Sequence, residues 1–123
     1  MPVIPPVPNR DDQYFWDGVA DGRLLLQRCG DCKVLRHPPQ PMCAACGSLA
    51  QETIAAAGRG TVFTWLLSDD RIATIVELEE GIRLVSNLVD VDRADVRIGM
   101  PVVLTFRELD GVALPQFRPA AVA

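Results

Sequence analysis

The pattern of hydrophobic and polar positions changes at Gly58, and the two sides of that residue predict different structures. After it, β-branched and other apolar residues recur in short runs separated by turn signals, a pattern typical of consecutive β-strands. Glu80-Gly81 and Asp110-Gly111 mark tight hairpins. A capped helical turn is expected at residues 92–99, between the third and fourth strands. The strands are predicted at residues 60–67, 72–79, 82–91, 102–108 and 112–118.

Five short strands with a helical insertion after the third are the elements of an OB-fold barrel, and an SH3-like barrel is the alternative. The sequence therefore predicts a mainly β protein whose barrel domain occupies residues 58–119.

Residues 1–23 predict an N-terminal arm followed by a short helix. Four of the ten prolines fall within residues 1–8, which favours an extended arm. Asn9 or Asp11 can cap the helix, and Gly22 can end it with a left-handed residue. Phe15, Trp16 and Val19 share one face by their spacing. That face either packs on the core of this chain or docks on another chain.

Residues 24–50 contain all four cysteines of the chain, Cys29, Cys32, Cys43 and Cys46. A strand at residues 23–28 leads into them, and residues 47–58 read as a linker. Each half is a Cys-x-x-Cys knuckle, and two knuckles supply the full tetrahedral shell of a structural zinc site. Gly30 and Gly47 sit where the knuckles must turn. We therefore predict a zinc ribbon, with iron as the main rival metal.

Other uses of the cysteines fit the sequence less well. Disulfide frameworks belong to secreted chains with dispersed cysteines, and no signal-type segment or membrane-length apolar run is seen. We expect a cytoplasmic protein. A dithiol oxidoreductase would need a cysteine at a helix N-terminus, which this pattern does not predict. His37 is the only histidine, and we expect it on the surface of the loop between the knuckles.

The charge distribution argues against binding of nucleic acid. The chain has 12 basic and 16 acidic side chains and a net charge of -4. Residues 1–60 are balanced, so the acidic excess lies in the predicted barrel, which a polyanion would avoid. Arg28, Lys33 and Arg36 form a local basic cluster. They either offset the charge of a zinc tetrathiolate or, with Arg59, contact the phosphates of a ligand.

No catalytic arrangement is evident in the sequence. The serines have no histidine at a suggestive spacing, and there is no nucleophile elbow or phosphate-binding glycine loop. We expect no enzymatic activity from this chain alone.

The order of motifs resembles a family known as domain of unknown function 35, over nearly the whole chain. Its members have a rubredoxin-like zinc ribbon followed by an OB-fold and are associated with acyl-CoA metabolism. One departure is Lys33, where many members have glycine. The matching motifs are Phe15-Trp16-x-Gly18, Cys29-x-x-Cys32, Cys43-x-x-Cys46, Gly58-x-Gly60-Thr-Val-Phe-Thr-Trp65, Ile98-Gly-Met-Pro-Val102 and Pro115-x-Phe117-Arg-Pro119.

The resemblance implies a non-catalytic accessory subunit of a thiolase-superfamily enzyme, either a thiolase or a lipid-transfer-protein-type aldolase. A hotdog-fold enoyl-CoA hydratase is a further expected partner, as in bacterial breakdown of steroid side chains. The subunit would complete the complex and help to hold an acyl-CoA thioester, with Phe15 and Trp16 at the partner contact. The alternatives are a nucleic-acid-binding zinc-ribbon protein and a rubredoxin-like electron carrier.

Overall fold

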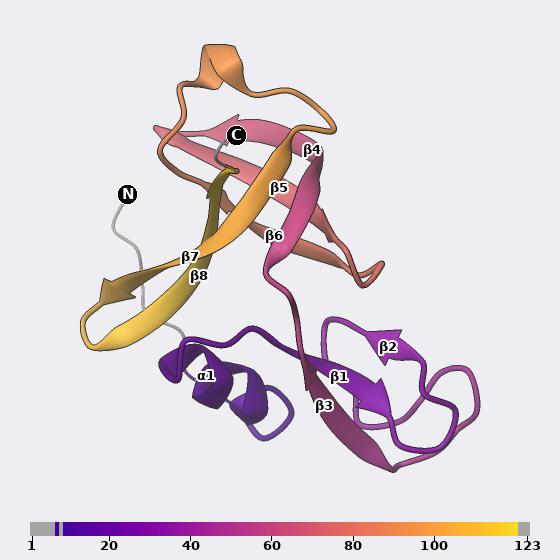
Figure 1. The fold of residues 1–123 in the computed structure, drawn as a ribbon. Coiled ribbons are helices and arrows are strands. Elements are labelled where there is room, and N and C mark those ends of the chain that lie inside the picture. The colour runs from indigo at the N-terminus through magenta and orange to yellow at the C-terminus, as the bar shows by residue number, and fades with distance from the viewer. Residues whose placement is uncertain (1–6, 8, 121–123) are drawn as a thin grey trace.

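The computed structural model describes residue 7 and residues 9–120 as one helix, a three-stranded ribbon sheet and a closed barrel (Figure 1). Helix α1 and the ribbon lie together below the barrel in this view. The elements are α1 (Gln13–Ala20), β1 (Leu25–Cys29), β2 (Leu35–Arg36), β3 (Gln51–Ala55), β4 (Arg59–Ser68), β5 (Arg71–Leu78), β6 (Arg83–Leu88), the 3-10 turn η1 (Arg93–Asp95), β7 (Pro101–Leu109) and β8 (Val112–Pro119).

The N-cap residue of helix α1 is Asp12, with no side-chain cap hydrogen bond, so the cap predicted at Asn9 or Asp11 was wrong. The side-chain oxygen of Asn9 accepts hydrogen bonds from the backbone N–H groups of Asp11 and Asp12, at 2.9 and 3.1 Å. This local turn delays the helix until Gln13. At the other end, Gly22 adopts the left-handed conformation, with φ at 75°, and the chain then turns into β1. The short helix buries Phe15 and Val19 against the core.

The ribbon sheet has the order β2-β1-β3, and all of its pairs are antiparallel. Strand β3 lies within the segment that we predicted as a linker, so that prediction was wrong for residues 51–55. The sequence of β3 gives only a weak strand signal, because Ile54 is its one large apolar residue. Pairing with β1 supplies the missing stabilisation: Leu26 lies opposite Ile54, and Cys29 opposite Gln51.

The barrel confirms the predicted five strands, with a helical turn between the third and fourth. Strands β4, β5, β6, β8 and β7 follow one another around it, and β4 pairs with β7 to close it. The predicted third strand was too long, because Asp90 has a φ of 59°, which an extended strand does not allow. Val62, Val76, Val102 and Phe117 are at most 1% exposed and form the centre of the core.

Strands β6 and β8 diverge from one another, so the wall of the barrel opens on the side that faces α1. Their only ladder pair is the parallel one between Leu88 and Phe117. Farther along, the hydroxyl of Ser86 donates to the carbonyl oxygen of Pro115 at 3.1 Å. A groove of the molecule lies at this opening.

Candidate metal centre and its flanking groove

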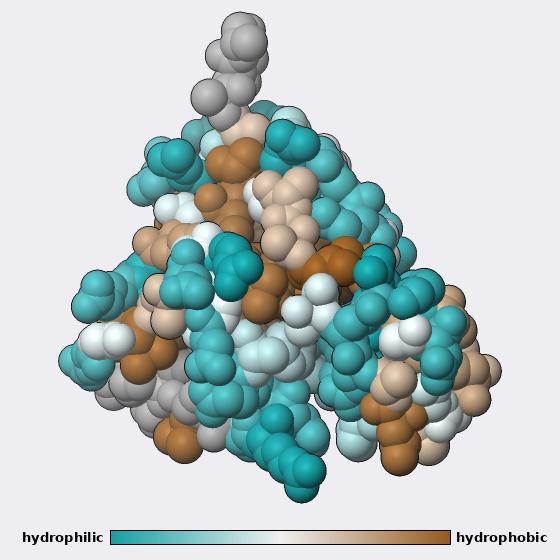
Figure 2. Space-filling view, turned by 60° about the horizontal axis from the view of Figure 1, so that its bottom comes forward, coloured by the Kyte–Doolittle hydropathy of each residue, from teal (hydrophilic) through white to brown (hydrophobic). Residues whose placement is uncertain are grey.

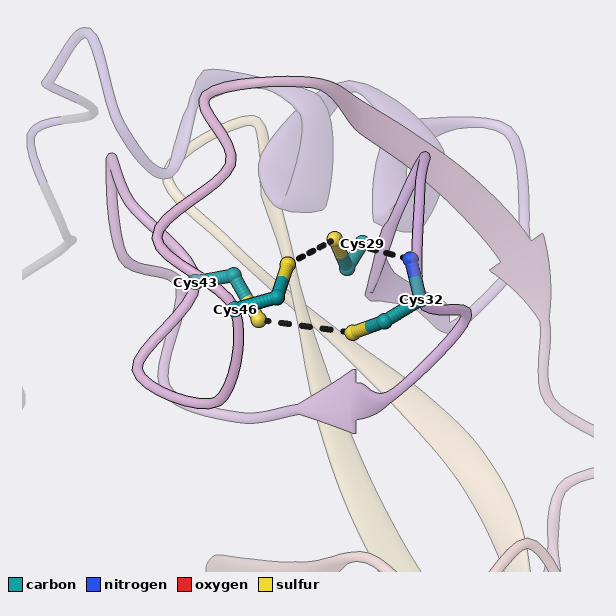
Figure 3. Close-up of side chains that lie close together, drawn as sticks. All are labelled: Cys29, Cys32, Cys43 and Cys46. Atoms are coloured by element: carbon teal, nitrogen blue, oxygen red, sulfur yellow. Dashed lines mark hydrogen bonds between the residues drawn. The ribbon is translucent and has the colours of Figure 1, made fainter.

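The four cysteines come together from two separate turns of the ribbon (Figure 3). Cys29 is the last residue of β1, Cys32 follows it in the first turn, and Cys43 and Cys46 flank the second turn. All four sulfur atoms lie within 4.8 Å of one another. The Cys29–Cys46 and Cys32–Cys43 sulfur pairs are each 3.6 Å apart.

These distances fit a metal shell and do not fit disulfides. A disulfide holds its sulfurs at about 2.05 Å, well below the 3.6 Å seen here. A tetrahedral zinc with Zn–S bonds of about 2.3 Å places its sulfurs roughly 3.8 Å apart. The cluster therefore has the size and the donor set of a four-thiolate metal site.

Backbone N–H groups favour the thiolate form at all four positions, and at Cys29 and Cys43 the pKa is lowered overall. The N–H of Cys32 donates to the Cys29 sulfur at 3.4 Å, and this bond with that from Asp31 lowers the pKa of Cys29 to about 6. N–H groups of Cys46 and Ala45 likewise lower the pKa of Cys43. Four thiolates this close repel one another, so a cation is needed to keep all of them deprotonated.

The turns of the two knuckles depend on different backbone features. Gly47 is left-handed, with φ at 77°, as its place in the second knuckle predicted. Gly30 is needed for a different reason: a Cβ there would lie 2.9 Å from the Cβ of Ala50. In the first knuckle the left-handed residue is Lys33, with φ at 66°. Glycine adopts such a φ without a steric cost, whereas lysine does not.

The candidate phosphate-binding arginines all have acceptors within the chain. Arg28 Nε and Lys33 Nζ both donate to Glu52 Oε1, at 2.5 and 3.1 Å. Together they lower the pKa of Glu52, with the Lys33 bond the larger influence. Arg59 Nε lies 2.9 Å from Glu79 Oε1. Glu52 thus offsets part of the charge of the basic cluster, and it is a residue that the sequence did not single out.

Arg36 belongs to a network of side-chain amides that supports the loop between the knuckles. Its Nε donates to Gln27 Oε1, and its Nη2 donates to the carbonyl oxygen of Gln40 at 3.2 Å. The Gln27 side chain also donates to Gln51 at 2.9 Å, although Gln27 is only 1% exposed. The sequence signal for this network was a glutamine that directly follows three leucines, at residues 24–26.

Phe15, Trp16 and His37 pack against one another where α1 meets the ribbon. Phe15 is 7% exposed and meets the edge of Trp16 at a centroid distance of 5.0 Å and an angle of 88°. The His37 ring lies 5.5 Å from Phe15, and burial lowers the pKa of His37. His37 is therefore half-buried, so the surface position that we predicted was wrong: packing on Phe15 draws it inward.

A groove of about 490 Å³ runs beside these rings into the opening between β6 and β8. One wall holds Phe15, Trp16 and the His37-Pro38-Pro39 segment. The other includes β6 residues 84–87 and β8 residues 114–116. Figure 2 shows hydrophobic residues gathered near the middle of the face that it presents, with hydrophilic residues around them.

Among the described residues, neither the Ser48 nor the Ser86 hydroxyl is bonded to a histidine. The Ser48 hydroxyl donates to Asp31, and that of Ser86 donates to a carbonyl oxygen. The only histidine of the chain stacks on Phe15. Within residues 7 and 9–120, the model has no helix with the length and apolar character needed to cross a membrane.

Two family models match the two parts of this architecture. The model described as the ChsH2 rubredoxin-like zinc ribbon domain matches residues 16–50, and that of the ChsH2 C-terminal OB-fold domain matches residues 53–107. A solved structure named "Ltp2-ChsH2(DUF35) aldolase" has a TM-score of 0.89 and 41% identity, covering 94% of this chain and 99% of the matched one.

Curated relatives carry names of two kinds. A probable enoyl-CoA hydratase alpha subunit of Thermomonospora curvata is 42% identical over 94% of this chain and 39% of its own length. The 3-oxo-4,17-pregnadiene-20-carboxyl-CoA hydratase alpha subunit of Mycobacterium tuberculosis is 36% identical over 95% of this chain and 40% of its own length. A DUF35 domain-containing scaffold protein of Methanocaldococcus jannaschii is 31% identical over 70% of this chain and 69% of its own length. The chain thus spans about two fifths of the length of the two hydratase subunits.

Proposed function

This chain belongs to the ChsH2 family of zinc-ribbon and OB-fold proteins, also called DUF35, and we propose that it is a non-catalytic accessory subunit of a thiolase-superfamily enzyme complex that acts on acyl-CoA thioesters. The observation that carries this proposal is the fold match to a chain of an aldolase, which covers 99% of that chain.

A finer proposal concerns the substrate and partners of the complex. The hydratase relatives act on CoA thioesters, one of them on a pregnadiene-carboxyl-CoA. We assign this chain to the same chemistry, the degradation of lipid or steroid side chains. A thiolase-like or aldolase subunit would carry the catalytic residues, and a hotdog-fold enoyl-CoA hydratase is the second expected partner. The four free thiols fit a reducing compartment, so the proposal places the complex in the cytoplasm.

The metal in this proposal is one structural zinc held by Cys29, Cys32, Cys43 and Cys46. Zinc bound there would cross-link the two turns of the ribbon and supply folding free energy. The four cysteines fill a tetrahedral shell, so no position is left for a water molecule or a substrate. The role of the zinc would be to fix the loop in which His37 packs beside Phe15.

The partner contact is proposed at Trp16, which lines the groove and is half-buried. Phe15 contributes by fixing the Trp16 ring from inside the fold. Among the arginines, Arg59 and Arg28 are the ones suited to phosphates, because their side chains are 64% and 35% exposed and can exchange a carboxylate for a phosphate. Arg36 is held by the amide network and positions the loop.

The proposal is tested by mixing the purified chain with the thiolase-like subunit encoded in the same organism. Size-exclusion chromatography with light scattering should detect a stoichiometric complex that elutes as one peak. Trp16→Ala should weaken the complex while zinc content is retained, and Phe15→Ala should lower the free energy of unfolding by about 3–5 kcal/mol. Separate elution of the two wild-type proteins would reject the proposed function. Iron in protein from native cells, with reversible one-electron chemistry, would favour an electron carrier.

A further inference from the structure

The outer face of strands β4, β5 and β6 carries large apolar side chains that the barrel does not bury. Phe63, Leu66 and Val85 are 40%, 59% and 75% exposed. The ladder register places Leu66 opposite Ala73, and Val85 opposite Ile75. Alternate residues of β5 and β6 are buried, so these side chains lie together on the outside.

The centre of this face is hollow, because a small residue lies among larger ones. Ala73 sits between Leu66 on one neighbouring strand and Asn87 on the other. A cavity of about 230 Å³ opens there, lined by residues 64–66, residues 73–75 and Val85. Val85 also lines the groove beside Trp16. Val85 therefore lies at the edge of both the proposed partner contact and the hollow over Ala73.

The charge of the barrel as a whole does not suit nucleic acid, because the acidic excess of the chain lies after residue 60. The OB-fold often binds oligonucleotides on its second and third strands, which are β5 and β6 here, but such sites need cations and exposed stacking rings. On this face Arg83 lies over the Phe63 ring at 3.8 Å, and Arg71 has an interaction within the chain. The only lysine of the chain is Lys33, in the ribbon.

Shape and charge together indicate a different protein as the occupant. A second copy placed on a two-fold axis through the hollow would set one hollow against another and leave a void, which interfaces avoid. A protruding aliphatic or aromatic side chain would fill the hollow. At its edge, Arg83 Nε is 3.9 Å from Glu77 Oε1, beyond hydrogen-bond distance. The guanidinium therefore retains donors for a carboxylate of the partner.

We propose that the outer face of β4, β5 and β6, centred on the hollow over Ala73, is a docking surface for the partner subunit. The partner inserts one large apolar side chain into the hollow and presents an acidic side chain to Arg83. This inference rests on the proposed function, since it assigns the partner of that complex to a surface. It extends the contact beyond Trp16 and explains why apolar residues remain exposed on a barrel with a complete core.

The test compares matched apolar residues inside and outside this face. Val85→Asp and Leu66→Ser alter the docking surface. Ile98→Asp and Leu49→Ser alter side chains that are 70% and 73% exposed elsewhere. The affinity of each variant for the purified thiolase-like subunit is measured by calorimetry, after melting curves and zinc content have shown that the variant is folded. The first pair should weaken binding by about tenfold or more, as expected for interface anchors, and the second pair should not.

A photo-crosslinking residue gives a second readout that does not depend on stability. Placed at position 85 it should crosslink to the partner subunit, and at position 98 it should not. Wild-type affinity in all four variants, with no crosslink from position 85, would overturn the docking surface and leave the proposed function intact. A lack of binding by the wild type would contradict both. A Val85-dependent dimer of this chain alone, or Val85-dependent binding of an oligothymidylate, would also overturn the inference.

Discussion

The backbone N–H of Ala57 donates to Glu80 Oε2 at 2.9 Å, joining the segment after the ribbon to the hairpin between β5 and β6. Glu80 is half-buried, and its other carboxylate oxygen is buried without a partner in the described structure. The bond links residues 23 positions apart. It is therefore a direct contact between the segment that follows the ribbon and the barrel.

Glu80→Ala should lower the free energy of unfolding by about 1–3 kcal/mol, because the backbone N–H of Ala57 loses its charged acceptor. Glu79→Ala is the matched control. Its ion pair with Arg59 is 50–64% exposed, and such pairs contribute at most about 1 kcal/mol. Equal losses for both variants in urea unfolding would show that Glu80 has no special role.

Two substitutions at Lys33 test whether the left-handed backbone of the first knuckle favours glycine. Lys33→Gly and Lys33→Ala both remove the contact with Glu52, but only glycine adopts the observed φ of 66° without a steric cost. Lys33→Gly should therefore be the more stable of the two by about 1 kcal/mol. Chemical denaturation of the zinc-loaded proteins measures the difference. A more stable alanine variant would contradict the assigned conformation.

His37 should make stability sensitive to mild acid. Burial lowers the pKa of His37 in the folded state below its usual value of 6.5, so between these two pKa values the unfolded chain binds more protons. The contribution of neutral His37 to the free energy of unfolding is complete above pH 6.5. It is lost as the pH falls through the pKa that His37 has in the folded state. Stability measured from pH 7.5 to 5 should fall less steeply for His37→Gln than for the wild type. Parallel curves would contradict this prediction, and the comparison cancels effects that arise at the cysteines.

Removing the metal should unfold the ribbon while the barrel remains. Cys43→Ser takes one ligand from the site, and a three-ligand shell should bind zinc far more weakly. We expect protection from amide hydrogen exchange to be lost in β1 and β3 and retained in β5 and β7. The barrel has its own core of Val62, Val76 and Phe117. Full protection of the ribbon after chelation would mean that the metal is not structural.

The features that the sequence predicted are those that depend on local patterns. The spacing of the two knuckles anticipated the cysteine cluster, and alternating apolar residues with Glu80-Gly81 and Asp110-Gly111 turns anticipated the barrel. The positive φ angles of Gly81, Asp110 and Gly111 are the backbone feature behind those turn signals.

The features that were missed depend on contacts between distant segments. Strand β3 has few apolar residues and forms because it pairs with the edge of β1. The paired residues Arg28 and Glu52 are 24 positions apart in the sequence. The burial of His37 depends on Phe15, and Gly30 is required by the approach of Ala50. None of these pairs leaves a local signal in the sequence.

The most direct test of the central claim measures acyl-CoA turnover by the thiolase-like subunit alone, by this chain alone and by the two together. The account predicts no turnover from this chain by itself. When both proteins are present, turnover should either appear or become at least tenfold faster than with the partner alone. A tenfold gain corresponds to an activation barrier that is lower by about 1.4 kcal/mol. Turnover by this chain free of its partner, or a partner that works equally well without it, would contradict the account.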